Sequence, residues 1–177
     1  ALGVSRGSVR EALLILERRH LVEIVPRRGA VVSGLSRRQF DDLFDLLEVL
    51  YGMIGRKMTL LWDEEDADRF ESALDDMAEA VAAEDAEAYA FACEQFLDEA
   101  LNLIRNRHLD AVIASMKPLS RRALHRLSRL DPDLLAQGMH SWRTWQEAMA
   151  AQDGKAVQNA IADCFSHHRA ILTRLLK

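Results

Sequence analysis

Proline, glycine and cysteine are scarce in this sequence. Its 177 residues include three prolines, eight glycines and two cysteines. The scarcity of proline and glycine leaves long stretches without helix breakers, which favours a mainly helical fold. Two cysteines without a framework spacing argue against a disulfide-stabilised secreted scaffold and fit a reducing compartment.

Long apolar runs are missing as well. No stretch approaches the roughly 20 consecutive apolar residues that a membrane-spanning helix needs, and no segment has the pattern of a signal peptide. We therefore expect a cytoplasmic protein with no membrane partner. Hydrophobic residues still make up 49% of the chain, which is enough to bury the core of one or two domains.

Lysine is absent from the N-terminal part, where arginine supplies all the positive charge. Residues 1–39 contain eight arginines and three glutamates, and the first lysine is Lys57. This segment carries a net charge of +5 and the whole chain carries −5, so the remainder carries −10. A basic segment on an acidic body is expected when only that segment contacts a polyanion such as DNA.

The segment from Gly3 to Leu13 has the features of the turn and second helix of a helix-turn-helix. Gly3 permits the tight turn between two helices, and Ser5 is placed to cap the helix that follows. We predict this helix over residues 5–19. The apolar residues expected to pack it against its own domain are Val4, Val9, Ala12 and Leu13.

Polar residues gather at the N-terminal end of this helix, the end that enters the major groove in such motifs. The planar guanidinium of arginine matches O6 and N7 of guanine, so Arg6 and Arg10 are candidates to contact bases. The hydroxyls of Ser5 and Ser8 and the free backbone N–H groups suit phosphates. We therefore expect double-stranded DNA as a partner.

Two short strands follow the helix. Residues 21–25 alternate as a strand, residues 26–29 form a turn, and residues 30–32 make a second strand. A ribbon with a basic tip directly after a recognition helix is a wing, and Arg28 and Gly29 at its tip are further candidate DNA contacts. The alternative is a surface helix with incidental arginines, but turn, helix and ribbon follow in the order of one motif.

Residues 36–177 show helical periodicity throughout. Ser36 and Gln39 form a capping box before a helix over residues 37–61. Asp63 is placed to cap the next helix, Pro118 should kink or restart the fourth, and Asp131 should cap the fifth. The pattern predicts an antiparallel bundle of six to seven amphipathic helices. The fold class is mainly α, with a partial winged helix-turn-helix over 1–35 and a helical domain over 36–177.

In these features the sequence resembles the GntR superfamily of bacterial winged-helix repressors. The runs that carry the resemblance are residues 4–13, 16–17, 21–22 and 28–32. The resemblance implies that Arg6 and Arg10 contact bases, that Ser5 and Ser8 hold phosphates, and that Gly29 approaches the minor groove. By the same resemblance, residues 1–2 would end a first helix whose remainder is absent, together with further DNA contacts.

The helical body resembles the FCD effector domain of the FadR-like branch. The resemblance depends on the number of helices and on two local runs, one near Phe96 and one over residues 148–161. It implies a homodimer on a palindromic operator, whose affinity changes when a small-molecule effector binds within the bundle. Many such domains hold a divalent metal through one aspartate and three histidines, which helps to bind a carboxylate effector.

The ligands of that metal site are missing from the matching positions. The aspartate corresponds to Cys93, and the three histidines correspond to Leu97, Trp142 and Cys164. If the alignment is shifted by two residues, the second histidine corresponds to His140 and not to Trp142. A hard cation prefers oxygen or imidazole ligands, so we expect neither this metal nor another cofactor. An arginine often found on the first bundle helix corresponds to Leu47.

Three interpretations of the altered site remain. The first is an apolar pocket for a fatty, acyl or aromatic effector, lined by Leu47, Tyr51, Cys93, Leu97, Trp142 and Cys164. The second is a soft-metal site of Cys93, Cys164 and His168. The third is an ordinary core in a body that only dimerises. No nucleophile–base pair or acid pair stands out, so we expect no enzyme.

Overall fold

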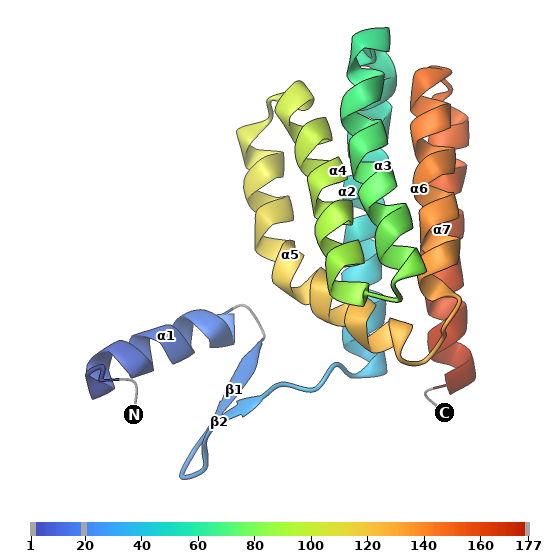
Figure 1. Cartoon of the computed structure of the whole chain (residues 1–177). Coiled ribbons are helices and arrows are strands. Elements are labelled where there is room, and N and C mark those ends of the chain that lie inside the picture. Colours follow the sequence, from blue (N-terminus) through green and yellow to red (C-terminus); the bar gives the residue numbers. More distant parts are fainter. Residues whose placement is uncertain (1–2, 19–20, 176–177) are drawn as a thin grey trace.

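The structure is a computed structural model that describes residues 3–18 and 21–175 (Figure 1). Its N-terminal part contains helix α1 (Arg6–Arg18) and strands β1 (Val22–Val25) and β2 (Gly29–Val32). The strands form an antiparallel ribbon directly after the helix. The predicted partial winged helix-turn-helix is therefore confirmed, whereas the predicted helix end at residues 1–2 lies outside the described residues.

Backbone and side-chain hydrogen bonds join α1 to the ribbon. The N–H of Leu21 donates to the carbonyl of Leu16 at 3.0 Å, and the N–H of Ser33 donates to the carbonyl of Leu21 at 3.1 Å. The N–H of Ile24 donates to the Glu17 carboxylate at 3.2 Å. Since β1 is held to the end of α1, the helix and the wing form one unit.

The rest of the chain forms the predicted helical bundle. Figure 1 shows most of its helices running side by side along a common direction. The elements are α2 (Arg37–Leu61), the short 3₁₀ helix η1 (Glu64–Asp66), α3 (Ala67–Ala82), α4 (Ala86–Ile104), α5 (Arg107–Ser128), α6 (Leu134–Ala150) and α7 (Gly154–Leu175). Within the described residues, no helix is both long enough and apolar enough to cross a membrane.

Most helix boundaries follow the capping residues in the sequence. Ser36 and Gln39 make the expected capping box, with the Ser36 N–H donating to Gln39 Oε1 at 2.9 Å. The N-cap predicted at Asp131 is wrong, because α6 begins only at Leu134. Asp131 instead accepts the N–H of Asp133 on its side chain and the N–H of Leu134 on its carbonyl. These bonds form a separate turn before the helix.

Pro118 lies inside a single helix, α5. The chain does not restart there, because residues on both sides keep helical geometry. Figure 1 shows that α5 changes direction along its length, as expected for a helix that loses one backbone hydrogen bond to proline. As a result, α5 crosses the other helices and covers one side of the bundle.

Aromatic side chains fill the middle of the bundle. Phe96 of α4 lies 4.8 Å from Phe70, 5.0 Å from Trp142 and 5.6 Å from Trp145 between ring centroids. Phe96 and Phe70 are fully buried. Edge and tilted contacts of this kind add to the area that each ring buries, so α3, α4 and α6 share one core.

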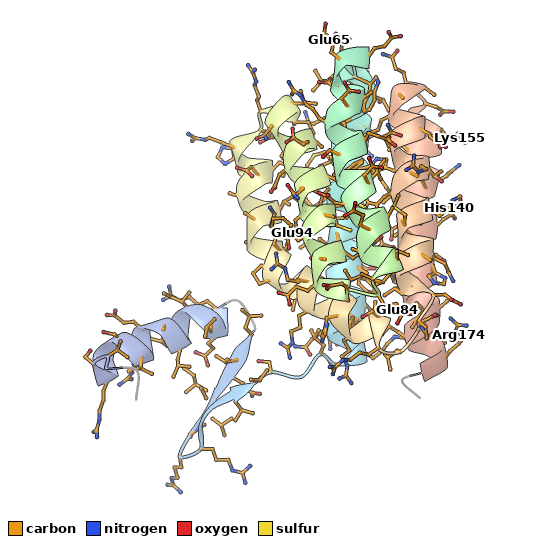
Figure 2. All side chains as sticks on the ribbon, viewed as in Figure 1. Glu65, Glu84, Glu94, His140, Lys155 and Arg174 are labelled. Atoms are coloured by element: carbon orange, nitrogen blue, oxygen red, sulfur yellow. The ribbon has the colours of Figure 1, made fainter. Side chains whose placement is uncertain are left out.

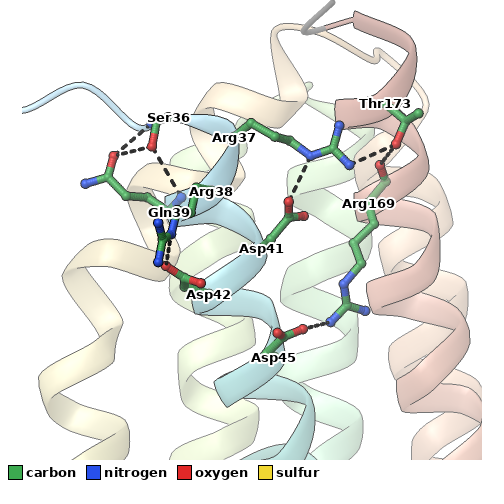
Figure 3. A network of polar contacts seen from close by, with 9 residues as sticks. All are labelled: Ser36, Arg37, Arg38, Gln39, Asp41, Asp42, Asp45, Arg169 and Thr173. Carbon is green, nitrogen blue, oxygen red and sulfur yellow. Dashed lines mark hydrogen bonds and ion pairs between the residues drawn. The ribbon is translucent and has the colours of Figure 1, made fainter.

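Ion pairs fasten the beginning of α2 to the end of α7 (Figure 3). Arg169 of α7 donates to Asp45 and to Glu48 at 2.8 Å each. Arg37 donates to Asp41 at 3.0 Å and to the Thr173 hydroxyl at 3.1 Å. The helix that leaves the wing is thereby held to α7.

Candidate functional site

The N-terminal turn of α1 presents an exposed basic and hydroxyl surface. The N–H of Ser8 donates to Ser5 Oγ at 3.1 Å, which is the predicted cap, and the two hydroxyls lie 2.9 Å apart. Arg6 and Arg10 on the same turns are exposed. Gly3 has a φ of +63°, which agrees with the predicted turn before the helix. This end of the helix therefore offers exposed arginine side chains beside two exposed hydroxyls that are hydrogen-bonded to each other.

The wing turn adds a second basic surface. The N–H of Arg28 donates to the carbonyl of Val25 at 3.1 Å, and Pro26 occupies the first central position. Arg27, the second central residue, has a φ of +65°, and Gly29 has a φ of +82°. These angles match a type II turn, in which the second central residue adopts positive φ. Both Arg27 and Arg28 are exposed at the tip. Arg27 was not among the predicted DNA contacts, although it is adjacent to Arg28.

The apolar residues of α1 do not pack as predicted. Val4, Val9 and Ala12 are exposed, and Leu13 is half-buried. None of the residues of α1 is fully buried. The ribbon covers only part of the helix, so much of its apolar face stays exposed among the described residues.

A partly open cavity of about 100 Å³ lies within the bundle. All six residues predicted for an effector pocket line it: Leu47, Tyr51, Cys93, Leu97, Trp142 and Cys164. They come from α2, α4, α6 and α7, so only the folded bundle brings them together. Helix α5, which contributed none of the predicted residues, covers the cavity with Ile113, Met116 and Leu124.

Neutral polar groups lie among these apolar walls. Burial raises the pKa of Tyr51 and of Cys93 well above their ordinary values. Burial likewise raises the pKa of Cys164 to about 11. The Tyr89 hydroxyl is buried without a hydrogen-bond partner among the described residues, and it lies so close to Gly138 that a Cβ there would approach it to 2.4 Å. The cavity walls therefore disfavour charge.

Charged side chains of α4 and α5 also line the cavity. Arg121 donates to both carboxylate oxygens of Glu94, at 3.1 and 2.8 Å, and this hydrogen bonding raises the pKa of Arg121. Lys117 donates to both carboxylate oxygens of Asp98, at 2.6 and 2.7 Å. Figure 2 shows Glu94 in the space between the two helices. Neither pair was predicted, because the partners lie 19 and 27 positions apart in the sequence and give no local signal.

A second, more open hollow of about 490 Å³ lies on the outer side of α6 and α7. Its wall shares Gly138, Cys164 and His168 with the cavity within the bundle. Burial, with His167 and Arg169 nearby, lowers the pKa of His168 to about 4. His168 is therefore neutral at pH 7. His140 also borders this hollow and lies on the outer face of α6 (Figure 2).

Comparison with known protein families identifies both parts of the chain. Residues 42–167 match the FCD domain, and residues 1–32 match the bacterial regulatory proteins of the gntR family. The chain belongs to the GntR family. Its larger part is an FCD domain, as the sequence resemblance implied.

This GntR protein is similar to several individual proteins. The chain is 26% identical over 116 residues to the gluconate operon transcriptional repressor of Bacillus subtilis (strain 168), and the match covers 66% of this chain. It spans about half of that relative, 47% of its length. Its fold resembles that of E. coli McbR/YncC, with a TM-score of 0.81 at 21% identity over 98% of this chain and 87% of the other. A GntR regulator from Rhodococcus sp. RHA1 has a TM-score of 0.72 at 24% identity, over 97% and 82% of the chains.

The metal site common in FCD domains does not fit the residues of this GntR protein. The four matching positions hold two thiols, a leucine and a tryptophan, and both thiols are kept neutral by burial. Among the described residues, no three His, Cys, Asp or Glu side chains come together to share a metal ion. The alternative site of Cys93, Cys164 and His168 therefore lacks the required geometry.

Proposed function

We propose that this GntR regulator binds a palindromic operator as a two-fold dimer through α1 and the wing. The observation that carries the proposal is the exposed basic end of α1 beside the exposed basic tip of the wing. Arginine at these two places suits base edges and phosphates. We infer a DNA-binding domain over residues 1–35 and an effector and dimerisation domain over residues 36–177.

The DNA-binding part of the proposal is tested on single arginines. An operator is first selected from random duplexes with the protein. Arg6→Ala and Arg10→Ala should each weaken binding to that operator by about 1–3 kcal/mol and relax specificity at one base pair. Arg18→Ala, at the other end of α1, is the matched control and should change binding far less. Equal losses on selected and random DNA would instead make Arg6 and Arg10 phosphate contacts.

An apolar stripe on α2 supports dimerisation. Leu46, Val49, Met53 and Leu60 recur along one face of the helix at intervals of three, four and seven residues. Val49 is 68% exposed and Leu60 is 84% exposed. Such spacing is that of a seam between two helices. We propose that the same stripe of a second copy packs against it, which would hold the two recognition helices roughly 34 Å apart on DNA.

The dimer is tested by charging the stripe. Val49→Asp should convert a dimer into a monomer at micromolar concentration, because a carboxylate cannot be buried unpaired in an apolar seam. Phe91→Asp is the control, since Phe91 is exposed on α4 outside the stripe. Sedimentation velocity measures both. A monomeric parent protein, or a Val49→Asp variant that stays dimeric, would contradict the proposal.

We further propose that the cavity within the bundle binds a small, mostly apolar effector. A cavity of about 100 Å³ is smaller than the roughly 150 Å³ cavity that admits benzene, so a long acyl chain would not fit without rearrangement. Binding should raise the melting temperature, change the fluorescence of Trp142 and alter operator affinity. Trp142→Phe should remove part of the fluorescence signal. If a set of small apolar compounds changes none of the melting temperature, the Trp142 fluorescence and the operator affinity, residues 36–177 would be better explained as a domain that only dimerises.

A further inference from the structure

We propose that Glu94 restricts the cavity to uncharged ligands by occupying Arg121, the cation to which a ligand carboxylate would bind. The inference rests on the proposed effector function of the cavity. In this arrangement a carboxylate of the protein takes the place of a carboxylate on the ligand. Glu94 is thus a residue that determines specificity.

The geometry of the pair carries the first step. Glu94 of α4 and Arg121 of α5 both line the cavity. The side chain of Glu94 is only 16% exposed, and both of its oxygens accept hydrogen bonds from Arg121, at 3.1 and 2.8 Å. A two-point contact of this kind is the strongest that a guanidinium makes with a carboxylate. A ligand anion would have to displace it.

The other basic residues of the lining offer no replacement. Lys117 is held by both oxygens of Asp98, at 2.6 and 2.7 Å. His168 is neutral at pH 7, since burial lowers its pKa to about 4. Among the described lining residues, every cation is therefore paired already. A carboxylate entering the cavity would lose its hydration without gaining a counter-ion, which is unfavourable.

The size of the cavity suggests a matched pair of probes. Butyramide and butyrate have the same shape and about six heavy atoms, but only butyrate is charged at pH 7. The cavity measures only about 100 Å³, so the probes should be small. It would have to widen slightly to admit six heavy atoms, because benzene, also with six, occupies a cavity of roughly 150 Å³. The parent protein should bind butyramide with millimolar affinity and butyrate at least about tenfold more weakly. Thermal stabilisation and Trp fluorescence both report binding.

Glu94→Gln is the decisive variant. It keeps the shape of the side chain and frees Arg121, so we expect butyrate to bind at least as tightly as butyramide. Adding Arg121→Gln to this variant should abolish the gain. Glu71→Gln is the control, because Glu71 pairs with Arg143 between α3 and α6 and neither residue lines the cavity. This control should keep the preference of the parent.

Each outcome is informative. If the parent binds butyrate as well as butyramide, or Glu94→Gln fails to gain butyrate, the specificity proposal is wrong while the effector cavity stands. If neither probe binds the parent or Glu94→Gln, the proposed effector function fails as well. Circular dichroism checks folding. If Glu94→Gln does not fold, Glu94→Ser replaces it, and it too should gain butyrate binding; a folded Glu94→Ser without that gain would contradict the proposal.

Discussion

Two glycines in one helix should respond in opposite ways to the same substitution. Gly52 and Gly55 lie three residues apart in α2, and both are buried. A Cβ at Gly55 would lie 2.2 Å from Val157 Cγ1 and 2.6 Å from Trp145 Nε1. A Cβ at Gly52 would meet nothing closer than the end of Arg56, at 3.8 Å.

The expected magnitudes follow from these contacts. Replacing glycine by alanine within a helix favours folding by about 0.8–1 kcal/mol. Gly52→Ala should show this gain. At Gly55 the new methyl group overlaps two side chains, of which Val157 is fully buried and Trp145 nearly so. Overpacking of this kind costs about 1–3 kcal/mol or more. Gly55→Ala should therefore destabilise the protein or at best leave its stability unchanged.

Urea unfolding followed by circular dichroism measures both variants. Comparing midpoints at equal m-value isolates the change in the free energy of unfolding. We expect the midpoint to rise for Gly52→Ala and to fall for Gly55→Ala. If both variants gained the same stability, the close packing of α2 against α6 and α7 at Gly55 would be wrong.

Three further results are expected. Arg169→Gln should lower the free energy of unfolding by about 1–2 kcal/mol, because it removes two partly exposed ion pairs between α7 and α2. Arg143→Gln breaks one ion pair and should lower it by less. Equal losses would indicate that the ion pairs of Arg169 do not stabilise the contact between α2 and α7. The rate of Cys164 alkylation in the folded protein should be low at pH 8. It should rise about tenfold per pH unit up to the pKa of about 11. Fast labelling at pH 8 would contradict the burial of this thiol. The pKa of His168 is about 4 when folded and 6.5 as its ordinary value, so neutral His168 contributes stability above pH 6.5 that is lost as the pH falls toward 4. His168→Phe should flatten that part of the stability profile, and an unchanged slope would exclude His168 as its cause.

The secondary structure was largely predictable because its signals are local. The box of Ser36 and Gln39 fixed the start of α2, and Asp85 caps α4 with bonds to two N–H groups. Errors arose where two local options compete. Asp131 has the chemistry of an N-cap, yet the structure uses it in a turn and begins α6 at Leu134. Sequence spacing cannot distinguish an N-cap from a turn at Asp131, because in either case Asp131 accepts hydrogen bonds from the N–H groups that follow it.

The cavity lining was predictable only through the family resemblance. Matching the ligands of an absent metal site led to Cys93 and Leu97 on α4, together with Trp142 and Cys164, and the fold places all of them around one cavity. Nothing in the sequence pointed to α5 as its cover. The pairing of Glu94 with Arg121 could not be predicted either, because the sequence does not show which acidic residue of α4 faces which basic residue of α5.

The sequence by itself determined the helices, the wing and the division between a basic first part and an acidic body. These follow from periodicity, caps and charge, which act between near neighbours in the chain. Only the tertiary structure decided how large the cavity is, which groups in it are neutral, and which cations are already paired. Those properties depend on distances between different helices and on burial, and both are set by packing of the whole bundle.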